Sequence, residues 1–160
     1  MRNKIFYILA PVSIMGIIFI FSSQPYHEQD LRPAMNDHIP LDVLEPLVAS
    51  IEIPYHNRIV SVESHGVAGM IEFIIRKFAH FAVFFTLMVA MYIATTRLVM
   101  WSFPTRWLTS FVVTIAYAGF DEFHQSLTPN RTPYVGDVVL DGAGALAAGI
   151  LILLFHRRSS

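Results

Sequence analysis

Two acids, an imidazole and an amide occur together at the end of a long apolar run. The segment Gly119–Ser126 reads Gly-Phe-Asp-Glu-Phe-His-Gln-Ser and contains Asp121, Glu122, His124 and Gln125. A carboxylate beside an imidazole suits general acid–base catalysis, because the acid can orient the ring that transfers a proton. Ionisable residues within membrane segments are costly, face a protein interior or a water-filled cavity, and mark functional sites. This segment is therefore the first candidate for a functional site.

A second group of charged residues follows immediately. Arg131, Asp137 and Asp141 lie just before, or at the start of, the last apolar run. The planar guanidinium of Arg131 can bind phosphate or carboxylate. Asp137 and Asp141 are at i and i+4 and share a helical face, which continues with the small residues Gly144 and Ala148. Small residues let helices approach closely, so we expect both acids to point towards neighbouring helices.

Two other apolar runs also carry polar residues at one end. Arg76 and His80 are at i and i+4, hence on one face of a helix. His80 is surrounded by phenylalanines in the sequence, so its imidazole needs a polar partner from another helix. The first apolar run ends with Ser22, Ser23 and Gln24, which can hydrogen-bond at a membrane interface. The simpler alternatives are an interfacial anchor for Arg76 and an ordinary polar turn after the first helix.

These polar groups must be positioned by apolar segments of membrane-spanning length. The chain has 160 residues, of which 54% are hydrophobic and 14% charged, and its mean hydropathy is +0.53. A spanning helix needs about 20 predominantly apolar residues. We therefore predict an all-α membrane protein with a single domain over residues 1–160 and four transmembrane helices, at about 5–22, 72–96, 107–125 and 136–155.

The charges are distributed unequally between the two sides of the predicted membrane. Basic residues without acids occur before the first helix, between the second and third, and after the fourth. They are Arg2, Lys4, Arg97, Arg106, Arg157 and Arg158. Because basic short loops stay in the cytoplasm, both termini should be cytoplasmic, and residues 23–70 should form a long external loop. All the candidate residues above would then meet at the external ends of the helices.

The predicted external loop carries little recognisable chemistry. Its histidines show no tight metal-ligand spacing. Leu44, Leu47, Val48 and Ile51 fall at helical spacing, which indicates a short amphipathic segment. That segment either lies on the membrane surface or packs over the helices.

Four motifs occur in order along the chain: Phe21-Ser22-Ser23-Gln24, Arg76-Lys77-x-Ala79-His80-Phe81, Asp121-Glu122-x-His124-Gln125, and Arg131-x-Pro133-x-x-x-Asp137 followed by Asp141-x-x-Gly144. With this spacing of apolar spans, the chain resembles the VanZ-like family of bacterial membrane proteins. The resemblance covers essentially the whole chain except the Pro25–Val67 loop.

The VanZ-like family takes its name from a member associated with resistance to the glycopeptide teicoplanin. The resemblance implies a multi-pass protein of the bacterial cytoplasmic membrane, part of the cell envelope. It does not define a molecular activity, and it leaves a link to glycopeptide susceptibility open.

One hypothesis is an enzyme that processes an amphiphilic envelope ligand, lipid-linked or phosphorylated. His80 or His124 would be the general base, Asp121 or Asp137 would orient the imidazole, and Glu122 would be the general acid. The predicted ligand-binding residues are Ser23, Gln24, Arg76, Gln125, Arg131 and Asp141. No recognised nucleophile motif occurs.

Two alternatives use the same residues without catalysis. One is a module that binds or shields an envelope precursor. The other is a purely structural polar network that fixes the helices, in which the loss of one partner of a buried ion pair costs about 3–5 kcal/mol. Whether the protein is an enzyme therefore stays open.

Composition limits the cofactors and partners. The chain has no cysteine, which excludes thiol chemistry, and its net charge of −1 gives no attraction to nucleic acid. A divalent cation on Glu122, His124, Asp137 and Asp141 is an alternative that these residue types allow, but their spacing matches no metal signature. We therefore predict neither metal nor cofactor, with membrane lipids and a lipid-linked precursor as partners and the oligomeric state open.

Overall fold

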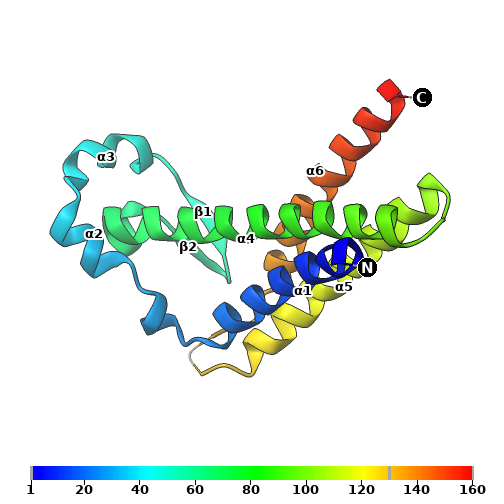
Figure 1. Cartoon of the computed structure of the whole chain (residues 1–160). Coiled ribbons are helices and arrows are strands. Elements are labelled where there is room, and N and C mark those ends of the chain that lie inside the picture. Colours follow the sequence, from blue (N-terminus) through cyan, green and yellow to red (C-terminus); the bar gives the residue numbers. More distant parts are fainter. Residues whose placement is uncertain (1, 130, 160) are drawn as a thin grey trace. The chain divides into compact units, whose positions relative to one another are not determined.

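The computed structural model describes residues 2–129 and 131–159, and 81% of the chain is helical. The elements in chain order are α1 (Arg2–Ser23), the 3-10 helix η1 (Tyr26–Gln29), α2 (Arg32–His38), α3 (Leu41–Val48), β1 (Ile53–Tyr55), β2 (Arg58–Val60), α4 (Val62–Leu98), α5 (Phe103–Ser126) and α6 (Val135–Ser159) (Figure 1). The all-α prediction is confirmed. The chain divides into two compact units, Met1–Pro25 with Ala79–Ser160, and Tyr26–Phe78.

Among the described residues, three helical segments are long and apolar enough to span a membrane: Lys4–Ser23, Val62–Leu98 and Val135–Arg158. The protein therefore has the helices of a membrane protein. Helix α5, the third predicted span, is not among them. It carries Arg106, Asp121 and Glu122, and these charged groups lower its apolar character.

All four helices of the first unit contribute to one apolar core. Ile18 of α1, Phe84 and Leu87 of α4 and Ala118 of α5 are buried together, and Val138 of α6 packs against them. Phe84 and Ala118 are fully buried. This core joins helices that are far apart in the sequence and so fixes the positions of the polar residues at their ends.

Small residues on α6 allow close contact with its neighbours. A Cβ atom at Gly144 would lie 2.3 Å from the carbonyl oxygen of Phe81, so α6 touches the backbone of α4 there. Further along α6, the indole Nε1 of Trp107 donates a hydrogen bond to the carbonyl oxygen of Gly149, at 2.9 Å. The stripe predicted from the sequence thus faces neighbouring helices, and Ala148 within it is fully buried.

The second unit fills most of the predicted external loop with regular structure. Strands β1 and β2 pair antiparallel, with Ile53 opposite Val60. His56 and Asn57 connect them with positive φ angles of 49° and 59°, as in the two-residue turns that match the twist of a hairpin. Helix α3 overlaps the predicted amphipathic segment, although Ile51 lies beyond its end, and it buries Val48.

Helix α4 begins at Val62 rather than near residue 72. The helix is interrupted only at Gly66, whose φ of 71° is in the region that glycine tolerates. The sequence prediction assigned residues 23–70 to an external loop and began this span at about residue 72. In the structure Glu72 and Arg76 pair with each other within the helix, at 2.6 Å.

The contact at Gly144 predicts a selective loss of stability. Replacement of Gly144 by Ala should destabilise the protein by about 1–3 kcal/mol, since the new methyl group collides with backbone that cannot move freely. Thermal unfolding in detergent measures this loss. Gly119→Ala is the matched control, because a Cβ there meets nothing within 4 Å. Equal melting temperatures for the two variants would contradict the close approach of α4 and α6.

Candidate functional site

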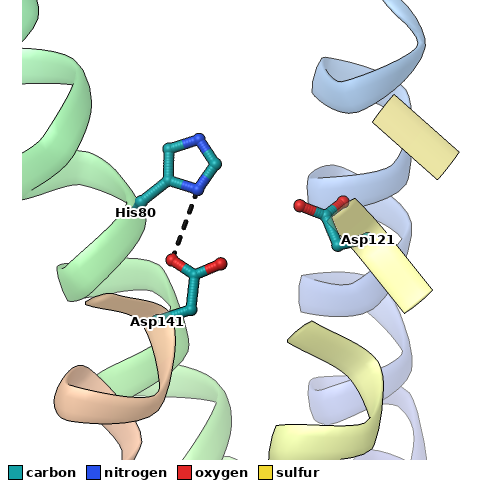
Figure 2. Close-up of side chains that lie close together, drawn as sticks. All are labelled: His80, Asp121 and Asp141. Carbon is teal, nitrogen blue, oxygen red and sulfur yellow. Dashed lines mark ion pairs between the residues drawn. The ribbon is translucent and has the colours of Figure 1, made fainter. Parts of the chain in front are cut away.

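The half-buried His80 and the buried Asp121 and Asp141 form a cluster within the first unit, which we call the acid–histidine cluster. They come from α4, α5 and α6, respectively, and one ligand atom of each lies within 4.8 Å of the others. The Nδ1 atom of His80 is 3.3 Å from Oδ1 of Asp141. Figure 2 shows these two side chains facing each other, with the carboxylate of Asp121 directed towards them from α5. Asp121 is 1% exposed and Asp141 is 2% exposed.

The close approach of α4 and α6 explains why Asp141 lies beside His80. Phe81, which follows His80, contacts Gly144, and Asp141 precedes Gly144 by about one helical turn. One turn further along α4 from His80, Phe84 is fully buried in the apolar core. The cluster therefore lies at the polar end of a packed apolar interior.

Hydrogen bonds hold the carboxylate of Asp121. The hydroxyl of Ser22 donates to Oδ1 at 2.5 Å, and the amide of Gln125 donates to Oδ2 at 2.8 Å. Ser22 is further fixed because its carbonyl oxygen accepts a hydrogen bond from the Thr128 hydroxyl, at 3.0 Å. Both oxygens of Asp121 thus have protein donors, although each keeps a lone pair.

Arg131 connects this network to the end of α1. Its guanidinium donates to the side-chain oxygen of Gln125 at 3.3 Å and to the carbonyl oxygens of Gln24, at 3.1 Å, and Phe21, at 3.4 Å. A cation at the carbonyl end of a helix interacts favourably with the helix dipole. Arg131 therefore both closes α1 and supplies positive charge near Asp121.

Glu122 and His124 have other neighbours. The backbone N–H of Tyr134 donates a hydrogen bond to Glu122, which ties the end of α5 to the start of α6. The ring of His124 stacks on Phe19, with 4.1 Å between ring centres. Its Nδ1 atom is buried without a hydrogen-bond partner among residues 2–129 and 131–159. His124 thus contacts an aromatic ring, whereas His80 pairs with an acid.

The remaining candidates of the first unit lie around the cluster. Asp137 is half-buried in the first turn of α6. Ser23 is exposed, and its hydroxyl bonds to the carbonyl oxygen of Phe19 in its own helix, at 2.7 Å. The serine that contacts Asp121 is Ser22, which was absent from the predicted ligand-binding set. No sequence signal separates it from Ser23, because the apolar residues of α1 precede both serines.

Arg76 belongs to the second unit and contributes to a separate network there. It pairs with Glu72, which is 2% exposed, and donates to the side-chain oxygen of Gln29 at 3.1 Å. Glu72 also accepts a hydrogen bond from the hydroxyl of Tyr26, at 3.2 Å, and lies 3.4 Å from Nε of Arg32. The sequence analysis missed Glu72, although an acid four residues before an arginine is a recognisable helical pair.

A surface ion pair of the second unit changes the titration of an acid. Arg32 donates to both carboxylate oxygens of Asp30, at 2.8 and 2.6 Å. These hydrogen bonds lower the pKa of Asp30 from 3.8 to about 2. For the same reason, the pKa of Arg32 is raised.

Comparison with known proteins identifies one match. A family model described as VanZ/LLP1 matches residues 5–156, which confirms the resemblance inferred from the four motifs. Searches of curated proteins and of solved structures gave no match.

The ion pair between Asp30 and Arg32 predicts how the stability of the folded chain changes at acid pH. Because the pKa of Asp30 is depressed in the folded state, its stabilising contribution is present above about pH 4 and is lost as the pH falls through about 2. NMR titration of the carboxyl carbon should give a midpoint near 2, and Arg32→Gln should raise it towards 3.8. Arg58→Gln is the control, since Arg58 is exposed. The same midpoint in wild type and Arg32→Gln would contradict the assignment.

Ser22 and Ser23 give a matched test of the network around Asp121. Ser22→Ala removes a donor from a buried carboxylate and should destabilise the chain by about 1–3 kcal/mol. Ser23→Ala removes an exposed hydroxyl that bonds within its own helix, so it should have a much smaller effect. Thermal unfolding of both variants in the same detergent decides the issue. A larger loss for Ser23→Ala would show that the wrong serine has been assigned.

Proposed function

The chain belongs to the VanZ/LLP1 family of membrane proteins, and we propose that it is a multi-pass protein of the bacterial cytoplasmic membrane that binds the polar head of an amphiphilic envelope ligand. The observation that carries this proposal is the buried acid–histidine cluster, formed by residues of three different helices. Such groups are costly in a membrane protein and characteristically serve ligand or ion sites. The ligand class that fits is a lipid-linked, phosphorylated envelope precursor.

The proposed topology has four spans, namely α1, the first-unit part of α4, α5 and α6. Helix α5 can be a span because its buried polar groups find partners inside the unit, as the lipid interior requires. Asp121, for example, receives hydrogen bonds from Ser22 and Gln125. Basic residues at the opposite helix ends support a topology with both termini in the cytoplasm and the cluster towards the external face.

In this proposal His80 is the residue through which a ligand reaches the cluster. Its side chain is 21% exposed, whereas that of Asp141 is 3% exposed. Asp137 is half-buried in the first turn of α6, and Arg131 adds a positive charge that favours an anionic head group. Ser23 and Gln24 lie at the end of α1 and complete the proposed contacts, while membrane lipids surround the helices.

Catalysis is a second candidate function, supported by the 3.3 Å contact of His80 with Asp141. A carboxylate beside Nδ1 can fix the ring tautomer and stabilise the imidazolium, which leaves Nε2 to accept a proton from a reacting group. His80 would then be the general base and Asp141 the residue that orients it. The sequence analysis had assigned that orienting role to Asp121 or Asp137.

Binding can be tested with a polyprenyl phosphate and the corresponding polyprenol, using the full chain in lipid nanodiscs. We expect measurable binding of the phosphate and at least about tenfold weaker binding by His80→Gln, since a charged hydrogen bond contributes about 1.5–3 kcal/mol. Microscale thermophoresis measures both affinities.

The control is His65→Gln, which changes an exposed histidine of the same helix. Equal affinity of the two variants for the phosphate would remove His80 from the site. If His80→Gln lost affinity only together with its cooperative thermal unfolding, the purely structural network would be the better account. No preference for the phosphate over the polyprenol would contradict the proposed ligand class.

A further inference from the structure

We infer that the acid–histidine cluster binds one divalent transition-metal cation, for which Zn²⁺ and Mn²⁺ are the best-suited ions. This inference deepens the proposed function and takes its biological meaning from it, but metal binding can be measured without any envelope ligand. It differs from the sequence analysis, which predicted no metal. It also differs from the alternative raised there, because only Asp141 is common to the two sets of ligands.

The geometry of the three side chains is close to that of a coordination sphere. Ligand atoms about 2.1 Å from one ion are about 3.4 Å apart at a tetrahedral angle. Nδ1 of His80 and Oδ1 of Asp141 are already 3.3 Å apart. One ligand atom of each of the three residues lies within 4.8 Å of the others, so a small movement of the Asp121 carboxylate would complete the sphere. Figure 2 shows that this carboxylate already points towards the other two side chains.

Buried polar atoms that lack a hydrogen-bond partner are a second indication of a ligand. Asp141 is 2% exposed, and its Oδ1 atom has no hydrogen-bond partner in the described part of the chain. Nδ1 of His80 likewise has no hydrogen-bond partner there, and its contact with Oδ1 of Asp141, at 3.3 Å, is an ion pair only if the imidazole is protonated. A buried polar atom without a partner is costly. An ion between these two atoms would satisfy both.

The negative charge of the two buried acids is a third argument for a bound cation. Asp121 and Asp141 place two carboxylates in a buried region where charges are poorly solvated, and the imidazole of His80 can contribute at most one positive charge. Arg131 donates a hydrogen bond to Gln125, which in turn donates to Asp121. A divalent cation would balance the two acids directly and remove their mutual repulsion.

The residues around Asp121 resemble the supporting hydrogen bonds of metal sites. Ligating carboxylates are usually held by hydrogen bonds from neighbouring residues, which fix their orientation and raise affinity. Ser22 and Gln125 supply such bonds to the two oxygens of Asp121. Each oxygen retains a lone pair for an ion.

Mixed nitrogen and oxygen ligands indicate the ion and its use. Imidazole suits Zn²⁺ and related ions, and carboxylates suit Mn²⁺ as well. Three protein ligands leave at least one open position, which a phosphate oxygen can occupy. The cation would therefore explain how a cluster with two acids accepts the anionic head group of the proposed ligand.

Metal content of the full chain tests the inference. The protein is purified in detergent, treated with EDTA, dialysed against Zn²⁺ or Mn²⁺, freed of excess ion and analysed by mass spectrometry. We expect about one ion per wild-type chain and at least about tenfold less in Asp141→Asn, because a protein ligand is lost. Asp42→Asn is the matched control, since Asp42 is an exposed acid of the second unit; it should retain the wild-type content. Equal content in Asp141→Asn and wild type would overturn the assignment.

A measurement on the wild-type chain guards against variants that fail to fold. Saturating Zn²⁺ or Mn²⁺ should raise the melting temperature by several degrees over EDTA, because an ion that binds only the folded state stabilises it. Co²⁺ should give visible absorption bands that His65→Gln retains and His80→Gln loses. The same melting temperature with metal and with EDTA would overturn the inference.

The outcomes also separate this inference from the proposed function. One bound ion without affinity for polyprenyl phosphate would support the metal site and contradict the proposed ligand. Phosphate binding that is unchanged by EDTA, in a chain that holds no ion, would overturn the metal site and leave the proposed function standing.

Discussion

Burial of two carboxylates at the ends of apolar helices is the constraint on which the first unit depends. Asp121 and Asp141 are almost fully buried, so water cannot solvate them. Their partners must come from other helices, and they do: Ser22 from α1 and His80 from α4. These contacts require the helices to approach closely, which Gly144 permits at Phe81. Packing and polar chemistry therefore depend on the same residues.

The second unit also buries an acid, but it surrounds that acid with positively charged side chains. Its buried acid, Glu72, is accompanied by two arginines and a tyrosine hydroxyl. Positive charge is therefore present beside this acid, and the network needs no further cation. In the acid–histidine cluster, one imidazole stands beside two acids. This difference in local charge is why we assign a metal ion to the cluster and a stabilising role to the network of Glu72.

Residue types and spacing were sufficient to predict the helical class, the family and several members of the cluster. His80 among phenylalanines, and Asp141 on a stripe of small residues, both indicated inward-facing side chains. The choice of partners was not predictable. Ser22 and Ser23 are adjacent and chemically identical, and only the rotation of α1 against α5 determines which one meets Asp121. The roles of His80 and His124 likewise depend on helix packing, since one pairs with an acid and the other stacks on Phe19. The early start of α4 was not predicted, because residues 23–70 were assigned to an external loop.

The central claim is that α4 and α6 bring His80 and Asp141 together, and the absence of native cysteine makes it directly testable. Paired cysteines at positions 80 and 141 can be introduced and oxidised in native membranes, with formation of the disulfide followed by mass spectrometry. We expect efficient cross-linking of this pair and little for cysteines at 80 and 143, because Ala143 is exposed on another face of α6. Equal cross-linking of the two pairs, or a preference for 80 with 143, would contradict it.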